Sequence, residues 1–522
     1  MELWGGVGGA FYPPVSDSSR VCAADGDAHL GKKEKEPMFR FDNTYARLPE
    51  KFSARVAPAK VPKPELIKWN TELAGQLGAQ AESPPDMELA EVFTGQKLLP
   101  GSEPIALVYA GHQFGHFVHQ LGDGRALLMG EVVDPSGRRH DIQLKGSGRT
   151  PFSRGGDGKA PLGPVLREYL VSEALHHLGL STTRSLAATK TGELVYRDRV
   201  LPGAILTRVA SSHIRVGTFE YFAAQQDLEN LKRLTEYSIK RHYPEIQNDS
   251  EAHLSFFRKV GHAQVELVTS WMALGFIHGV MNTDNMSIAG ETIDFGPCAF
   301  MDQFRFNQVF SSIDQFGRYS YSNQAQVTLW NLSRLGKCLV LLTDHGSKEA
   351  AEMLNKELES LGTLFEQRLA SKMLKKLGIF KDVQPQDSDL VSQWLRYLET
   401  QQLDYTLSFR DLANLVENDA DFNFFEWTST FQDFYQLWQK RVQNQDLETE
   451  TIKEEMNRVN PVFIARNHKI EQVIEAGLKG DFSLFHEMNE VLKKPYEEQE
   501  EFSSYKLAPR PEEVVQATFC GT

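Results

Sequence analysis

The segment HGVMNTDNMSIAGETIDFGPCAFMD carries residues at a spacing that suits phosphate-transfer chemistry. In the pattern His-x-Asp-x-x-x-x-Asn followed by Asp-Phe-Gly, the first Asp accepts the substrate proton, and the Asn and the second Asp bind metal. Here His278, Asn285 and Asp294 keep their places, but Val280 stands where the base is expected. The carboxylate that could replace the base is Asp284, directly before Asn285.

An amide oxygen and a carboxylate that converge on one point suit Mg²⁺ or Mn²⁺, which complete their coordination with phosphate and water oxygens. We expect the turn AGET, with a short strand on each side, to bring Asn285 and Asp294 together. The alternative is an Asn- and Asp-rich hairpin with ordinary turn chemistry.

Lys145 ends the alternating stretch DIQLK, which predicts a strand that points this lysine to one face of a sheet. Such a lysine can hold nucleotide phosphates if a carboxylate from the following helix fixes it. The helix expected in PLGPVLREYLVSEALHHLGL offers Glu168 and Glu173, about 140° apart around its axis, so only one should face the sheet. We choose Glu168 because it lies among apolar positions. The alternatives are a solvated lysine and a surface glutamate.

Two glycine-rich stretches could bring backbone N–H groups close to phosphates. The first, YAGHQFGHFVHQLGDGRALLMGEV, holds Gly122 and Gly124 directly before Arg125. The second, KGSGRTPFSRGGDGKAPLGP, holds Asp157 and Gly158 near the predicted helix start. A hairpin turn or a mobile loop would use the same residues. The histidines of the first stretch do not predict a zinc site, because glycines interrupt the helix that their spacing requires.

Short apolar runs with glycine-rich turns are followed by long amphipathic segments, which predicts an α+β protein with a two-lobed, protein-kinase-like fold. Within the β-rich lobe, RSLAATKTGELVYRDR predicts a hairpin that turns at Thr191 and Gly192. The expected parts are a flexible extension (1–38), a β-rich N-lobe with the nucleotide-binding loops (39–217), a larger helical C-lobe with the catalytic loop (218–500) and a flexible tail (501–522).

A net charge of −14 argues against binding to nucleic acid or to an anionic membrane, because both require a basic surface. The chain lacks an apolar run of about 18 to 20 residues that could span a bilayer, and its start lacks the pattern of an export signal. We expect a monomer in the cytoplasm, or in mitochondria if the source is a eukaryote. Four cysteines without a Cys-x-x-Cys pair leave room for a single regulatory bridge.

These motifs, in this order, resemble the selenoprotein O family, also called YdiU, of protein adenylyltransferases with a kinase-like fold. The resemblance begins near Phe41 with FDNTYARLP and continues through QLKGSGRTPFSRGGDGKAPLGPVLREYLVSEA, HGVMNTDNMSI, DFGPCAF and NPVFIARNH to the terminal CGT. It departs from the family at Ala465, where we expect Pro. The resemblance implies transfer of AMP from ATP to Ser, Thr or Tyr hydroxyls of protein substrates, with the nucleotide inverted relative to kinases and with Mg²⁺ or Mn²⁺.

The resemblance also assigns roles to individual residues. Asp284 would be the proton acceptor, Asn285 and Asp294 the metal ligands, and Glu168 the ion-pair partner of Lys145. The nucleotide contacts would be Gly122, Gly124, Arg125, Lys145, Asp157, Gly158, Arg208, Arg215 and Asp294, with the two later arginines on the outer phosphates. A regulatory bridge would join Cys298 to Cys520. Two other functions stay open: a kinase that moves the γ-phosphate, and an ATP-binding pseudokinase scaffold.

Overall fold

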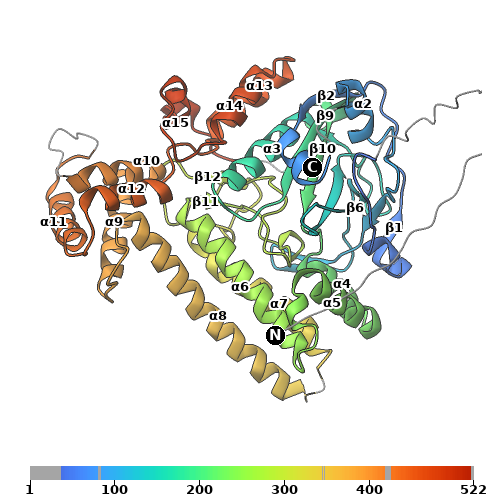
Figure 1. Ribbon diagram of the computed structural model, residues 1–522, viewed down its shortest axis with the longest axis horizontal. Coiled ribbons are helices and arrows are strands. Elements are labelled where there is room, and N and C mark those ends of the chain that lie inside the picture. Colours follow the sequence, from blue (N-terminus) through green and yellow to red (C-terminus); the bar gives the residue numbers. More distant parts are fainter. Residues whose placement is uncertain (1–36, 80–83, 344, 346, 418–424, 519–522) are drawn as a thin grey trace, which may run out of the picture. The chain divides into compact units, whose positions relative to one another are not determined.

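The computed structural model describes residues 37–79, 84–343, 345, 347–417 and 425–518. The chain divides into two units, Met1–Pro37 and Met38–Thr522, and every element below belongs to the second. Its first part is rich in strands and its later part in helices (Figure 1). The predicted α+β class is therefore confirmed, whereas the domain boundaries stay predictions.

The main sheet is antiparallel and supplies the strand that carries Lys145. Its strand order is β1-β3-β6-β7-β10-β9-β2, and β8 pairs with β10 beside this path. The strands are β1 (Ser53–Arg55), β2 (Glu65–Trp69), β3 (Ile105–Leu107), β6 (Ala126–Val133), β7 (Arg139–Lys145), β8 (Ala160–Pro161), β9 (Arg184–Tyr196) and β10 (Val200–Ala210). Strand β6 is buried almost throughout, which explains why its sequence ALLMGEVV is apolar at every position except Glu131.

Helices cover both faces of this sheet. Ala187 and Ala188 are neighbours on β9, so they point to opposite faces. Ala188 packs in the core that includes α3 (Leu162–His177), whereas Ala187 packs with α1 (Thr71–Gln76) and α2 (Asp86–Phe93). The position of α3 on the inner face sets its glutamates against the strands.

The β9–β10 hairpin turns at residues 197–199, so the turn expected at Thr191 and Gly192 is wrong. β9 runs through both residues, and its pairing with β10 shifts register nearby. Gly192 has a φ of +75°, and a Cβ there would lie 2.6 Å from Lys63 Cβ. Gly192 therefore permits an irregular backbone conformation within a long strand. Such irregularities favour glycine, as turns do.

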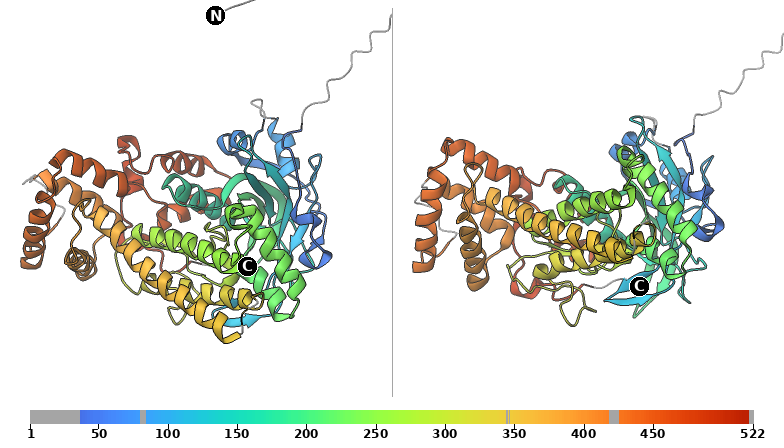
Figure 2. Two further views of the ribbon diagram at one scale, coloured as in Figure 1. Left: turned by 60° about the horizontal axis from the view of Figure 1, so that its bottom comes forward. Right: turned by 90° about the horizontal axis from the view of Figure 1, so that it is seen from below.

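The rest of the described chain is mainly helical. Its helices are α4 (Val216–Ala224), α5 (Leu228–His242), α6 (Ala252–Ala273), α7 (Gln324–Val340), α8 (Ser347–Lys376), α9 (Asp387–Gln401), α10 (Tyr405–Leu412), α11 (Ser429–Gln443), α12 (Thr449–Val459), α13 (Asn467–Leu478), α14 (Ser483–Val491) and α15 (Ser503–Lys506). Helices α6, α7 and α8 pack together, α9 to α12 lie away from the sheet, and α13 and α14 pack on α3 (Figures 1 and 2). Among the described residues, no helix has the length and apolar character that crossing a membrane requires.

A short antiparallel ribbon, β11 (Phe276–Ile277) with β12 (Ala299–Phe300), brackets the segment that carries the candidate catalytic residues. The strands expected on either side of the AGET turn do not pair with each other. Instead, Ser287 bridges to Arg215 and Thr292 bridges to Thr182. The segment is thus attached at separate points to the sheet side of the molecule.

Candidate active site

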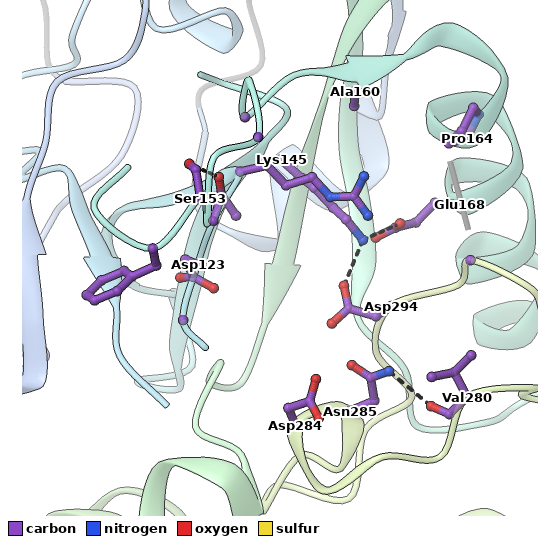
Figure 3. Close-up of a pocket in the computed structure, with 18 of the residues that line it drawn as sticks. Asp123, Lys145, Ser153, Ala160, Pro164, Glu168, Val280, Asp284, Asn285 and Asp294 are labelled. Atoms are coloured by element: carbon purple, nitrogen blue, oxygen red, sulfur yellow. Dashed lines mark hydrogen bonds and ion pairs between the residues drawn. The ribbon is translucent and has the colours of Figure 1, made fainter. Parts of the chain in front are cut away.

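A cavity of about 450 Å³ opens between the main sheet, α3 and the segment after β11. It is lined by all twelve residues that the sequence selected for nucleotide, metal, base or ion-pair roles: Gly122, Gly124, Arg125, Lys145, Asp157, Gly158, Glu168, Arg208, Arg215, Asp284, Asn285 and Asp294. Figure 3 shows Lys145, Glu168 and Asp294 pointing toward one another, with Asp284 and Asn285 below them. Residues far apart in the sequence therefore share one site.

Asp294 is the centre of an ion cluster in this cavity. Its Oδ1 accepts hydrogen bonds from Lys145 Nζ and Arg208 Nη1, and its Oδ2 accepts one from Arg215 Nη1, each at 2.7 Å. Glu168 accepts from the same Lys145 at 2.6 Å and from the same Arg208 at 3.3 Å. Burial alone would raise the pKa of Asp294, but the three cations outweigh it and hold the pKa well below its usual range. The carboxylate is therefore ionised.

The register of the sheet explains why these cations meet. Arg208 on β10 stands opposite Gln143 on β7, two residues before Lys145, so the three side chains share one face. Gln143 accepts a hydrogen bond from Arg208 Nε at 2.6 Å. Asp294 completes the cluster with a backbone φ of +65°, a conformation that is strained for a residue with a Cβ.

Both glutamates of α3 contact the sheet side, contrary to the expectation that only one would. Glu168 reaches Lys145, whereas Glu173 pairs with Arg184 at 2.8 Å. Glu168 pairs with a residue of β7 and Glu173 with a residue of β9. Although the two glutamates point in different directions around α3, neither is exposed to solvent. The Glu173 pair attaches α3 to the sheet without entering the cavity.

Asp284 and Asn285, the candidate base and metal ligand, lie in a 3-10 turn, Thr283–Asn285. Asn285 Nδ2 donates to the backbone oxygen of Val280 at 3.0 Å, which leaves its amide oxygen on the side of Asp294 (Figure 3). The Val280 side chain is itself buried. Asp284 is 6% exposed, and burial raises its pKa to about 6. A carboxylate with a raised pKa beside a cavity can accept a proton from a hydroxyl group.

The two glycine-rich loops touch each other at the edge of the cavity. Gly122 and Gly158 have φ values of +112° and +71°, which residues with a Cβ rarely adopt. A Cβ at Gly122 would lie 2.6 Å from the ring of Phe152, and a Cβ at Gly158 would overlap the backbone oxygen of Gly148. Gly122 therefore permits the first loop to pack on the second, and Gly158 permits the second loop to fold closely on itself.

Several polar residues that line the site escaped the sequence reasoning, among them Asp123, Arg197 and Gln113. Arg197, in the β9–β10 turn, makes two hydrogen bonds to Asp157, at 2.9 and 3.0 Å, which lower the pKa of that carboxyl. Burial raises the pKa of Asp123 to about 6, and its Oδ1 lies 3.8 Å from an Arg215 nitrogen. The position of Asp123 between two selected glycines was a usable signal.

The described residues contain no group of three or more His, Cys, Asp and Glu side chains that could hold a metal ion. One amide oxygen and one carboxylate face the cavity at Asn285 and Asp294. This donor set fits Mg²⁺ or Mn²⁺ bound together with nucleotide phosphates, because such ions take few protein ligands and keep phosphate and water oxygens.

Of the two predicted redox residues, Cys298 is fully buried, and Cys520 lies outside the described residues. Thr518, two positions before Cys520, hydrogen-bonds through its hydroxyl to the backbone oxygen of Pro297 at 2.6 Å. It also forms a parallel bridge with Ser311. The described end of the tail therefore lies beside the residue that precedes Cys298, and the bridge itself stays a prediction.

A cavity that gathers three cations around an ionised Asp, beside an Asn and a second Asp, has the character of a nucleotide-dependent phosphotransfer site. The family model "Protein adenylyltransferase SelO" matches residues 37–493. "Protein nucleotidyltransferase YdiU" of Rhizobium meliloti (strain 1021) is 50% identical over 489 residues, which cover 93% of this chain and 99% of the relative. The relative of the same name from Nitrobacter hamburgensis is 49% identical over 514 residues, 98% of this chain and 100% of the relative. The chain belongs to the SelO/YdiU family of protein nucleotidyltransferases.

Proposed function

We propose that this protein transfers AMP from ATP to hydroxyl side chains of protein substrates and releases pyrophosphate. The observation that carries the proposal is the single cavity lined by all twelve selected residues, in a chain of the SelO/YdiU family. The family descriptions name the reaction class, and the residues proposed as base, phosphate-binding cations and metal ligands all line the same cavity.

In the proposed reaction, the acceptor hydroxyl oxygen attacks the α-phosphorus, and its proton passes to Asp284. The bond from the α-phosphorus to the bridging oxygen breaks, and that oxygen leaves with pyrophosphate. Lys145, Arg208 and Arg215 stabilise the negative charge that grows on the leaving group, which is the main contribution of a protein to such transfers. Asn285 and Asp294 would hold a divalent cation, which supplies further charge neutralisation when it is bound.

The depth of the two arginines supports the inverted orientation of the nucleotide. Arg208 and Arg215 are each 2% exposed. If they hold the outer phosphates, those phosphates lie deep in the cavity and the α-phosphate faces the acceptor. Gly122, Gly124, Arg125, Asp157 and Gly158 would then hold the remainder of the nucleotide at the loops.

We also assign the chain a two-lobed, kinase-like fold. An antiparallel sheet with α3 beside it contributes Lys145 and Glu168, and a later helical part contributes the catalytic segment. The same pattern, with Asn285 and Asp-Phe-Gly, favours a kinase that transfers the γ-phosphate as the second candidate. The buried apolar side chain of Val280 at the usual base position speaks against that candidate.

The deciding experiment supplies ATP labelled on either the α- or the γ-phosphate together with Mg²⁺ or Mn²⁺ and a pool of Ser-, Thr- and Tyr-containing peptides. Label transferred from the α-position alone supports adenylylation. Label from the γ-position alone identifies a kinase, and label from neither, with ATP still bound, identifies a scaffold.

Redox control through Cys298 and Cys520 forms a separate part of the proposal. The contacts of Thr518 place the described end of the tail beside the segment after Asp-Phe-Gly, and closure of a long loop costs little more than closure of a short one. We expect mild oxidation to yield a peptide pair linked through Cys298 and Cys520. Addition of a thiol reductant should raise AMP transfer by the wild type but not by Cys520→Ala. Two reduced thiols in the oxidised protein, or equal thiol responses, would contradict this control.

A further inference from the structure

The motif HQFGHF, which the proposed nucleotide contacts do not use, forms a β-hairpin. It packs against the turn Thr283–Asn285, called the catalytic turn below because it carries the proposed base. Its strands β4 (Gly111–Gln113) and β5 (His116–Val118) pair antiparallel. Three consecutive residues each bond to the catalytic segment: His112 N–H to Thr283 Oγ1 (2.7 Å), Gln113 Nε2 to Asp284 Oδ2 (3.1 Å) and Phe114 N–H to Asn282 Oδ1 (3.1 Å). This run of bonds fixes the register between hairpin and segment.

The backbone of the hairpin lies directly against the Asp284 carboxylate. A Cβ at Gly111 would lie 2.5 Å from Asp284 Oδ1, so only glycine permits this approach. A Cβ at Gly217, at the start of α4, would likewise overlap the backbone oxygen of Ala110. Two glycines thus remove the space between the hairpin, α4 and the proposed base.

Glu220 on α4 holds the hairpin and the catalytic turn together from a buried position. It hydrogen-bonds to His112 Nδ1 at 2.5 Å and accepts a hydrogen bond from the Thr283 hydroxyl. The hairpin therefore cannot shift relative to the turn without breaking bonds to a buried carboxylate, which is costly. The backbone that carries the Gln113 side chain is therefore held in a fixed position relative to the turn.

We propose that Gln113 is a positioning residue for the transfer reaction: its side-chain amide orients the Asp284 carboxylate toward the acceptor hydroxyl. This inference rests on the proposed function, in which Asp284 is the base. Asp284 Oδ1 is buried and has no hydrogen-bond partner among the described residues, so the Gln113 bond to Oδ2 sets the rotation of the carboxylate. An oriented base accelerates transfer, whereas ATP binding does not depend on that rotation.

A purely structural role would make Gln113 a spacer that fills the wall of the cavity. Two substitutions separate a spacer from a donor. Gln113→Met keeps the length and bulk of the side chain but removes the N–H donor. Gln113→His changes the shape but retains an N–H at about the reach of the Gln amide nitrogen. Gln120→Met, at an exposed position after the hairpin, is the matched control.

The experiment measures ATP affinity and single-turnover transfer of α-label to the peptide pool at saturating ATP. We expect Gln113→Met to slow transfer roughly 10- to 100-fold, the range for loss of a hydrogen bond to a charged group, with ATP affinity unchanged. Gln113→His should recover a substantial part of the rate, and Gln120→Met should match the wild type.

Three results would overturn the proposal: a wild-type rate in Gln113→Met, a loss of ATP affinity with the rate retained, or equal losses in the Met and His variants. Thermal unfolding of each variant is measured first. If Gln113→Met does not fold, Gln113→Asn, which withdraws the amide by one methylene, replaces it under the same criteria. Failure of the proposed function is distinguishable, because the wild type would then transfer no α-label.

Discussion

Replacement of Asp294 by Asn should abolish the dependence of ATP binding on metal. The Asp294 carboxylate accepts hydrogen bonds from Lys145, Arg208 and Arg215, each at 2.7 Å. The proposed function gives the same three cations to the phosphates of ATP. Asp294 and the phosphates would therefore compete for them. Asp294 would hold a divalent cation, whose charge would relieve this competition. Without the carboxylate charge, the competition and the metal requirement for binding should both disappear.

The magnitude follows from the geometry. A phosphate oxygen that shares a guanidinium nitrogen with Asp294 would lie about 5 Å from its carboxylate, given two hydrogen bonds of ordinary length. At an effective dielectric constant of about 20, the repulsion between two unit charges at that separation is about 3 kcal/mol, or roughly 200-fold in affinity. Because solvent enters the open side of the cavity, we expect metal-free ATP to bind about 10- to 100-fold tighter to Asp294→Asn.

The assay is calorimetric titration of ATP in excess chelator and in excess Mg²⁺, with transfer of α-label measured in parallel. Asp294→Asn should bind ATP equally under both conditions and transfer no label. Asp198→Asn, which removes an exposed carboxylate at the β9–β10 turn, should behave as the wild type. The loss of a shared partner for buried cations costs several kcal/mol of stability, so unfolding is followed with and without pyrophosphate, which should restore it. Metal-free affinity that stays at or below the wild-type value, or near-normal transfer, would refute the reasoning.

Three further predictions test other parts of the site and core. Asp284→Ala should retain ATP affinity and slow transfer by about 10²- to 10⁴-fold, the usual contribution of a general base; lost affinity with an unchanged saturated rate would make Asp284 a ligand. Arg215→Ala should impair the binding of ATP far more than that of AMP, and equal losses would remove it from the outer phosphates. Lys376 is buried, with its Nζ 4.3 Å from the centre of the Phe409 ring, and burial lowers its pKa to about 7. Because the unfolded lysine binds a proton up to a pKa of 10.5, the unfolded state holds more protons between pH 7 and 10.5, and wild-type stability should rise with pH across that window. Lys376→Met should add about 2 to 3 kcal/mol to the free energy of unfolding at pH 7.5. Holding the amine neutral three pH units below its unfolded pKa of 10.5 costs about 4 kcal/mol, and we expect imperfect packing of Met in the same space to cancel part of the gain. The exposed neighbour provides the control, and an equal gain in Lys375→Met would contradict the prediction.

Sequence reasoning succeeded where local periodicity and residue chemistry determine the outcome. Lys145 ends an alternating strand, and Glu168 lies on a helix that is buried almost throughout, so their pairing needs only the packing of that helix on its sheet. The turn assigned to Gly192 failed because a glycine inside a long irregular strand carries the same local signal as a turn.

Contacts that depend on the register between distant segments could not be predicted. Gln113 and Asp284 are separated by 171 positions, and no property of HQFGHF points to the catalytic turn. Arg197 meets Asp157 only because the β9–β10 hairpin extends as far as the second glycine-rich loop. Such pairs form when whole elements dock, so their residue types carry no signal until the fold is known.

The displaced base has a consequence for how the site is assembled. Asp284 and Asn285 share one 3-10 turn, so the proposed base and a proposed metal ligand cannot be positioned independently. Two hydrogen bonds hold this turn: Val280 O accepts from the Asn285 amide, and Gln113 donates to the Asp284 carboxylate. Loosening either hydrogen bond should therefore disturb proton acceptance and metal binding to different degrees. In a loop whose base lies five residues before the Asn, at the position of Val280, different backbone segments would position the base and the metal ligand. Here the proposed base is next to Asn285, and the β4–β5 hairpin positions it through Gln113.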